Sequence, residues 1–238
     1  MEADMRRQLR FGEMLQDLLQ VDDETWGQYA FSRELLKNRI EATKKSEMIA
    51  KAISCGKEYA QKTILEVGSA DLQTIAQTYK LKIEFHDALL TGKRILFARY
   101  TPPDQIEIME EPINKAVSLI SKEHPNFVEL FKKDDIIDII LGHEIFHFLE
   151  EQNEREIYTR NEKILLWKFM GFKNYSTIQV LGEIGAMAFI KALKGLPYSP
   201  FILDFILYYS YDSLSAEKIY RDIMEKNLER CKDTVEDY

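Results

Sequence analysis

The amino-acid sequence predicts an α+β protein in which a small antiparallel or mixed sheet packs beside a mostly helical body. Apolar residues recur at helical spacing in residues 1–65 and again in most of the chain after residue 112. Between these parts lie short runs rich in β-branched and aromatic residues, separated by turn residues. Strands and helices are thus grouped along the sequence rather than alternating, which is typical of α+β folds.

Residues 1–55 are expected to form an N-terminal helical segment that acts as a cap or an interaction arm. Its first helix carries an amphipathic stripe that includes Phe11 and Leu15, and the stretch VDDETWGQ (21–28) is expected to break it. A helix-turn-helix module is the alternative. However, residues 1–62 hold 11 Lys and Arg against 11 Asp and Glu, so this segment lacks the basic face of a DNA-binding domain.

Residues 71–109 are expected to supply the sheet. Asp71 is suited to cap a short helix, and LKIEF (81–85) predicts a strand. The runs RILFARYT (94–101) and QIEIM (105–109) flank a Pro-Pro-Asp turn signal, so they predict a β-hairpin.

The remainder of the chain is expected to be helical. One helix is predicted to begin at Pro112, and the next to begin at Asp134 or Asp135 and to run to about Glu151. The second of these is apolar almost all round, which is typical of a buried helix. Four more helices are predicted, at about 154–170, 177–194, 200–211 and 214–231.

Charge and cysteine content limit the class of protein. The 238-residue chain has a net charge of −8 and no basic half, so direct nucleic-acid binding is not expected. The N-terminus lacks the apolar core of a signal peptide, and no apolar run approaches the roughly 18 residues of a membrane span. The two cysteines are expected to be free thiols. Together these features predict a cytoplasmic protein without a membrane partner.

The segment His143-Glu144-Ile145-Phe146-His147 is an H-E-x-x-H motif. Two histidines four residues apart lie on one face of a helix, so both imidazoles can bind one metal ion. Glu144 can then accept a proton from a water molecule at a zinc ion. The alternative is a pair of core histidines, but two histidines and a carboxylate would be costly to bury in so apolar a helix without metal. We therefore expect His143 and His147 to bind Zn²⁺ and Glu144 to be the catalytic base.

Zinc hydrolases generally use three protein ligands, so one more residue must complete the site. A histidine at position 153 would fit one common pattern, but that residue is Asn153, and the upstream His86 and His124 are expected to be structural. Three glutamates follow the motif on the same helix. The first lies about 10 Å beyond His143 at 1.5 Å per residue, whereas ligand atoms lie within about 2.2 Å of zinc. These three are expected to form a solvated helix end: Glu150, Glu151 and Glu154.

Glu183 is the remaining candidate, in the otherwise apolar segment VLGEIGAMAFIKAL. Gly182 and Gly185 each cost about 1 kcal/mol relative to alanine inside a helix, so they need a reason. Close approach to a second helix is one, with Gly142 beside His143 as a matching small residue. A lone carboxylate in such a helix also needs a positive partner, which zinc would supply.

The order of these segments resembles the ImmA/IrrE family of bacterial zinc metallopeptidases over about residues 56–200. The matching parts are a helix-to-strand element from Asp71 to Ile83, a strand hairpin, the stretch IEIMEEPINKA, the H-E-x-x-H helix, and an E-x-x-A-x-x-F segment from Glu183 to Phe189 that is followed by Leu196-Pro197. This chain departs from the family in having Phe146 where the motif commonly has glycine, so the phenylalanine is expected to fill space near the site.

The resemblance implies a zincin-like metallopeptidase domain over residues 56–238, with Glu183 as the third zinc ligand. It also implies cleavage of a specific protein partner, such as a transcriptional repressor. Two alternatives stay open: a regulatory or binding protein that retains the zincin scaffold without turnover, and a metal-dependent hydrolase of a small amide. A donor for the oxyanion is also needed, and three tyrosines lie in suitable regions: Tyr100, Tyr158 and Tyr175.

Overall fold

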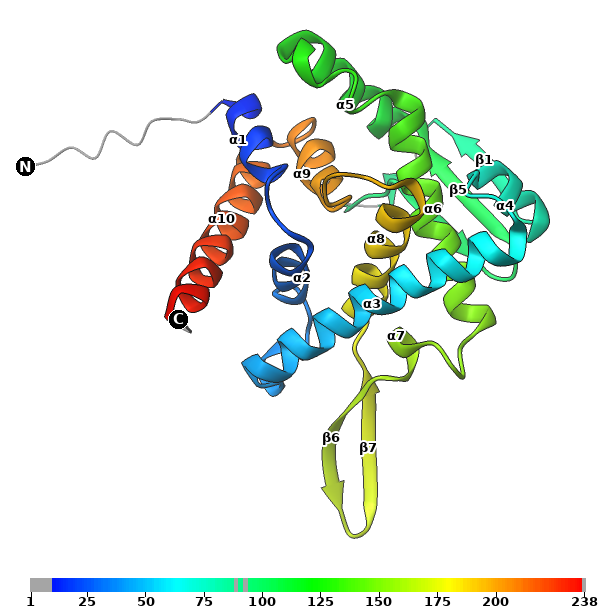
Figure 1. Cartoon of the computed structure of the whole chain (residues 1–238), viewed down its shortest axis with the longest axis vertical. Helices are drawn as coiled ribbons and strands as arrows, with labels where there is room; N and C mark the ends of the chain where they lie inside the picture. The colour runs from blue at the N-terminus through cyan, green and yellow to red at the C-terminus, as the bar shows by residue number, and fades with distance from the viewer. Residues whose placement is uncertain (1–9, 88–89, 92–93, 237–238) are drawn as a thin grey trace, which may run out of the picture.

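The computed structural model describes residues 10–87, 90–91 and 94–236 and has the expected α+β composition. Its α-helices are α1 (Phe11–Leu18), α2 (Asp23–Phe31), α3 (Ala42–Val67), α4 (Leu72–Thr78), α5 (Glu110–Glu123), α6 (Lys133–Gln152), α7 (Tyr158–Asn161), α8 (Val180–Lys194), α9 (Ile202–Tyr209) and α10 (Ser213–Glu236). Its strands are β1 (Lys82–His86), β2 (Leu90–Thr91), β3 (Arg94–Ile95), β4 (Ala98–Thr101), β5 (Gln105–Met109), β6 (Lys163–Phe169) and β7 (Phe172–Thr177). Short 3-10 helices span Lys37–Arg39 and Pro125–Phe127. Figure 1 shows their arrangement.

The main sheet is small and mixed, with strand order β1-β5-β4. Strand β1 pairs with β5 in parallel, and β4 pairs with β5 in antiparallel register with Tyr100 opposite Ile106. The predicted strand near 81–85 and a hairpin around the Pro-Pro-Asp turn are therefore confirmed. The run 94–101, expected as one strand, is divided: β3 pairs with β2, and only β4 belongs to the hairpin. Strand β4 forms one edge of this sheet, and it lies against α6.

Three helices build the core beside this sheet. Helix α8 packs between α3 and α6, and α6 in turn packs on β4 and β5. Helices α3 and α8 come unusually close because glycines face each other: a Cβ on Gly56 would lie 2.2 Å from the carbonyl oxygen of Gly185. Helix α3 is continuous from Ala42 to Val67, so the domain boundary expected at residue 55 falls inside a helix that lines the core.

The predicted helix at 154–170 is wrong. That segment holds the single turn α7 and then the antiparallel hairpin β6–β7, which projects from the helical body (Figure 1). The sequence KILLWKF is a short apolar run that fits a strand as well as a helix, and the chain reverses at Met170 and Gly171, both with positive φ (45° and 88°). The helix expected from residue 177 therefore begins at Val180.

Two other boundaries also differ from the prediction. The stretch expected to break the first helix starts a new one, α2, where the Asp22 side chain caps the helix by accepting a hydrogen bond from the Thr25 backbone N–H at 2.8 Å. Helix α6 begins at Lys133, so Asp134 and Asp135 lie in its first turn, where they favour the positive end of the helix dipole without capping it.

The remaining expectations concern thiols and membrane spans. Cys55 is a free, buried thiol, whereas the side chain of Cys231 lies outside the part of the molecule that is described. Within the described residues, no helix combines the length and the apolar character needed to cross a bilayer.

Candidate metal centre

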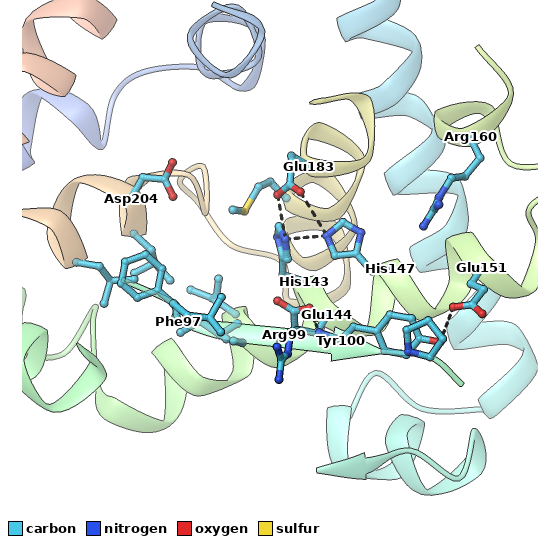
Figure 2. Close-up of a pocket in the computed structure, with 18 of the residues that line it drawn as sticks. Phe97, Arg99, Tyr100, His143, Glu144, His147, Glu151, Arg160, Glu183 and Asp204 are labelled. Carbon is cyan, nitrogen blue, oxygen red and sulfur yellow. Dashed lines mark hydrogen bonds and ion pairs between the residues drawn. The ribbon is translucent and has the colours of Figure 1, made fainter. Parts of the chain in front are cut away.

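Helices α6 and α8 bring together the three side chains that the sequence predicts as metal ligands. Figure 2 shows His143 and His147 on α6 facing Glu183 on α8. The Nε2 atoms of the two histidines lie 3.0 Å apart, and the Glu183 carboxylate lies 3.2 Å from His143 Nε2 and 3.7 Å from His147 Nε2. One ligand atom from each residue falls within 4.8 Å of the others, so this group could hold a metal ion. The three side chains that the sequence analysis grouped together are thus close to one another in the structure.

Small residues on both helices make this convergence sterically feasible. Glycine has no Cβ, and a Cβ placed at Gly142 would lie 2.2 Å from Ile190 Cδ1 on α8. Gly142 thus faces α8, as expected from its place beside His143. A Cβ on Gly182 would lie 2.9 Å from the carboxylate of Glu150, so Gly182 leaves room for that side chain.

Phe146 does not fill the space in front of the ligands. It is fully buried and packs in the core against Phe189 and Tyr59, with ring centroids 5.6 Å and 6.3 Å away. The room for its ring comes from Gly185, because a Cβ at that glycine would lie 2.8 Å from the Phe146 ring. Gly185 on α8 therefore accommodates the phenylalanine at position 146, and the ring does not line the cleft.

Glu144 lies on the β4 side of the histidines (Figure 2). Its side chain is buried, and its Oε2 accepts a hydrogen bond of 2.7 Å from the backbone N–H of Tyr100. This contact fixes the carboxylate beside the two histidines. It also shows that the outer edge of β4 faces α6.

The prediction that Glu150 belongs to a solvated helix end is wrong. Its side chain is only 2% exposed, and one oxygen lies 2.8 Å from Nδ1 of His147. The same carboxylate accepts a hydrogen bond of 2.5 Å from the Thr159 hydroxyl and lies 3.7 Å from Nε of Arg160. Glu150 therefore orients the ring of His147 so that Nε2 points toward Glu183, a supporting role that is common around metal-bound histidines.

The other two trailing glutamates differ from Glu150. Glu154 is exposed, as expected for a helix end, whereas Glu151 is half-buried and lies 2.9 Å from the hydroxyl of Tyr100. Among the described residues, none of the three belongs to the group of side chains that could hold a metal ion. The prediction overlooked a different role for Glu150. Its carboxylate can contact the ring of His147, one helical turn earlier at i−3, without approaching a metal ion.

The ligands also interact with one another electrostatically. Burial alone would lower the pKa of His143, but the hydrogen bond and the charge of Glu183 outweigh it and raise this pKa to about 9. Burial would likewise raise the pKa of Glu183, but its hydrogen bond to His143 and the charges of the two imidazoles lower it to about 2. The Glu183 side chain is 52% exposed, so solvent screens part of this attraction.

His143, His147, Glu183 and Glu144 lie at the wall of an open cleft of about 710 Å³. Strand β4 forms one side through Ala98, Arg99 and Tyr100, and residues of α9 form the far end. A second cavity of about 580 Å³ shares Glu183 and Asp204 with the first and extends the cleft toward α2 and the end of β7.

The other candidate residues lie apart from this cleft or along its rim. His86 lies 3.6 Å from Glu84 and Glu107 on the sheet, and the His124 ring lies 5.3 Å from the Phe11 ring in a tilted arrangement, so neither reaches the group formed by His143, His147 and Glu183. Of the three tyrosines considered for the oxyanion, Tyr100 lines the cleft, the hydroxyl of Tyr158 is buried without a hydrogen-bond partner, and Tyr175 is on the β6–β7 hairpin.

The comparisons with known proteins add no relative to this description. None of the family models, curated proteins or solved structures compared with the chain matches it. The likeness to the ImmA/IrrE family therefore stays a prediction from sequence motifs.

Proposed function

We propose that this chain is a zinc-dependent metallopeptidase that hydrolyses a peptide bond in a protein partner. The observation that carries the proposal is the convergence of His143, His147 and Glu183 in an open cleft, with Glu144 held beside them by the backbone of β4. Each of these four residues has the chemistry that this reaction requires, and each comes from the motif or helix in which that chemistry was expected.

The donor set fits zinc better than the common alternatives. Two imidazoles and one carboxylate are the ligands of a well-known class of catalytic zinc sites, whereas Mg²⁺ and Ca²⁺ prefer oxygen ligands. The buried contact from Glu150 to His147 supports the same assignment, since metal-bound histidines generally donate their second nitrogen to a carboxylate or carbonyl. Zinc at such a site supplies Lewis acidity and lowers the pKa of water toward about 7.

Glu144 is the residue that takes the proton in this proposal. Its Oε2 is held by the Tyr100 N–H, so the carboxylate cannot rotate away from the ligands without losing a buried hydrogen bond. The other oxygen can accept the proton of the attacking water and can later deliver it to the leaving amine. Arg160, which also lines the cleft, is a cation on the His147 side of the site and can approach an anionic group there.

The edge of β4 favours an extended peptide as the substrate. Backbone groups of a strand point to its two sides alternately, and the Tyr100 N–H points toward the cleft. Ala98, two residues earlier, therefore directs its N–H and C=O to the same side, and it lines the cleft. An extended chain can add to this edge by backbone hydrogen bonds. By its resemblance to the ImmA/IrrE family, the partner cleaved would be a repressor.

The proposal is tested by metal analysis and by cleavage. Purified protein is expected to hold about one zinc per chain, and the His143→Ala and His147→Ala variants are expected to lose it. A mixture of unstructured peptides should be cleaved by the zinc-loaded protein, and Glu144→Gln should keep the metal while cleaving at least about 100-fold more slowly. Absence of zinc uptake on titration, or equal cleavage by Glu144→Gln, would contradict the proposal.

A further inference from the structure

The β6–β7 hairpin exposes large apolar side chains far from the core. Figure 1 shows the ribbon extending away from the helical body. Ile164 is half-buried against the core, and Arg39 donates a hydrogen bond to the backbone oxygen of Leu166. Toward the turn, Phe169, Phe172 and Met170 are 67%, 74% and 83% exposed. Large exposed apolar side chains gathered in one place mark an interaction surface.

The register of the hairpin separates its side chains into two faces. Phe169 pairs with Phe172 and Lys168 pairs with Lys173, and successive side chains along a strand point to opposite faces. Trp167 therefore shares a face with the two phenylalanines, and the two lysines lie together on the other face. One side of the ribbon thus carries Trp167, Phe169 and Phe172, the other carries Lys168 and Lys173 together with Tyr175, and Met170 lies at the tip.

The charge of the hairpin is opposite to that of the chain. Residues 163–178 contain three lysines and no aspartate or glutamate, while the whole chain has a net charge of −8. A partner for this ribbon should accordingly be apolar where it meets the aromatic face and anionic where it meets Lys168 and Lys173. The hairpin of a second copy carries no acidic residue, so it would offer Lys168 and Lys173 no anionic partner.

We propose that the β6–β7 hairpin binds the surface of an anionic lipid bilayer. The tip and the aromatic face enter the boundary between headgroups and acyl chains, and Lys168 and Lys173 contact lipid phosphates. The dimensions agree, because the three steps from Trp167 to Met170 span about 10 Å in a strand and interfacial elements enter the bilayer by about 5–10 Å. Tryptophan at the depth of the headgroups is also typical of membrane interfaces.

This inference replaces the expectation of no membrane partner, which considered only segments able to cross the bilayer. A ribbon that enters one leaflet needs no such segment. The inference is independent of the proposed peptidase activity, because none of the hairpin residues named here touches the metal ligands. Glu144→Gln and His143→Ala should therefore bind lipid as the unaltered protein does.

The full chain can be tested on vesicles of phosphatidylcholine alone and with about 30% phosphatidylserine, an anionic lipid of cytoplasmic leaflets. Co-sedimentation with the anionic vesicles is expected, together with a blue shift of tryptophan emission. Trp26 is fully buried, so the shift should come from Trp167 and should vanish in Trp167→Phe. Lys168→Gln with Lys173→Gln should weaken binding roughly 30-fold, at about fivefold for each lysine.

Three further measurements decide the outcome. The triple variant Phe169→Ser, Met170→Ser and Phe172→Ser should stay in the supernatant with an unchanged melting temperature, because these side chains are exposed. Leu65→Ser, which removes an equally exposed apolar group from α3, should bind like the unaltered protein. The proposal is overturned if the unaltered protein ignores both vesicles, if the triple variant binds as well, or if the hairpin instead forms a dimer that the triple variant disperses.

Discussion

Replacing Glu150 by glutamine should weaken zinc binding although Glu150 cannot reach the metal. The substitution keeps the volume of the side chain, which fits against Gly182, but exchanges a carboxylate for a neutral amide beside Nδ1 of His147. Loss of such a supporting contact costs about 10- to 100-fold in metal affinity, or about 1.4–2.7 kcal/mol. Glu183→Gln removes a ligand itself and should cost more than Glu150→Gln.

Competitive chelation with a zinc-binding dye would measure these affinities at a single pH. Glu154→Gln is the matched control, since Glu154 is an exposed glutamate on the same helix and should leave the affinity unchanged. Denaturant unfolding of the metal-free proteins would show whether Glu150→Gln also disturbs the fold. The reasoning is refuted if Glu150→Gln binds zinc like the unaltered chain, or if Glu154→Gln loses as much affinity as Glu150→Gln.

Two more outcomes follow from the structure. Gly185→Ala places a methyl group 2.8 Å from the Phe146 ring, so crowding should lower the free energy of unfolding by about 1–3 kcal/mol in urea. Adding Phe146→Leu should recover part of this loss, and strict additivity of the two changes would contradict the contact. In metal-free protein, the pKa of His143 is raised from 6.5 to about 9 and the pKa of Glu183 is lowered from 4.5 to about 2, so their interaction stabilises the fold fully between about pH 4.5 and 6.5. The melting temperature measured with chelator should therefore fall as the pH rises from 6.5 through 9 and as it drops from 4.5 through 2. Glu183→Gln should flatten both slopes.

The parts of the molecule that depend on local periodicity were predictable. The apolar helix with two histidines one turn apart, the β4–β5 hairpin around its proline turn, and the small-residue helix that carries Glu183 are all present in the structure. Each rests on spacing within about twenty residues of sequence. The convergence of α6 and α8 was also predictable, because an isolated carboxylate among glycines and alanines has few other reasons to be there.

The parts that depend on distant contacts were not predictable. Glu150 is buried because Thr159 and Arg160, which follow the end of α6, fold back against it. The apolar pattern of the helix does not predict this contact. The segment 163–177 was assigned to a helix because its apolar run has no period that separates helix from strand. The division at residue 55 assumed that the N-terminal helices stand apart, whereas Gly56 brings α3 against the backbone of α8.

The fit of Phe146 over Gly185 has a consequence for how this sequence can change over generations. A ring at position 146 requires a missing side chain at position 185, and a glycine at 146 would leave a void that a larger residue at 185 could fill. Substitution at either position alone passes through a crowded or hollow intermediate, so the two should change together. Among homologous chains, glycine in the second variable position of the histidine motif should accompany alanine or a larger residue two positions after the ligand glutamate.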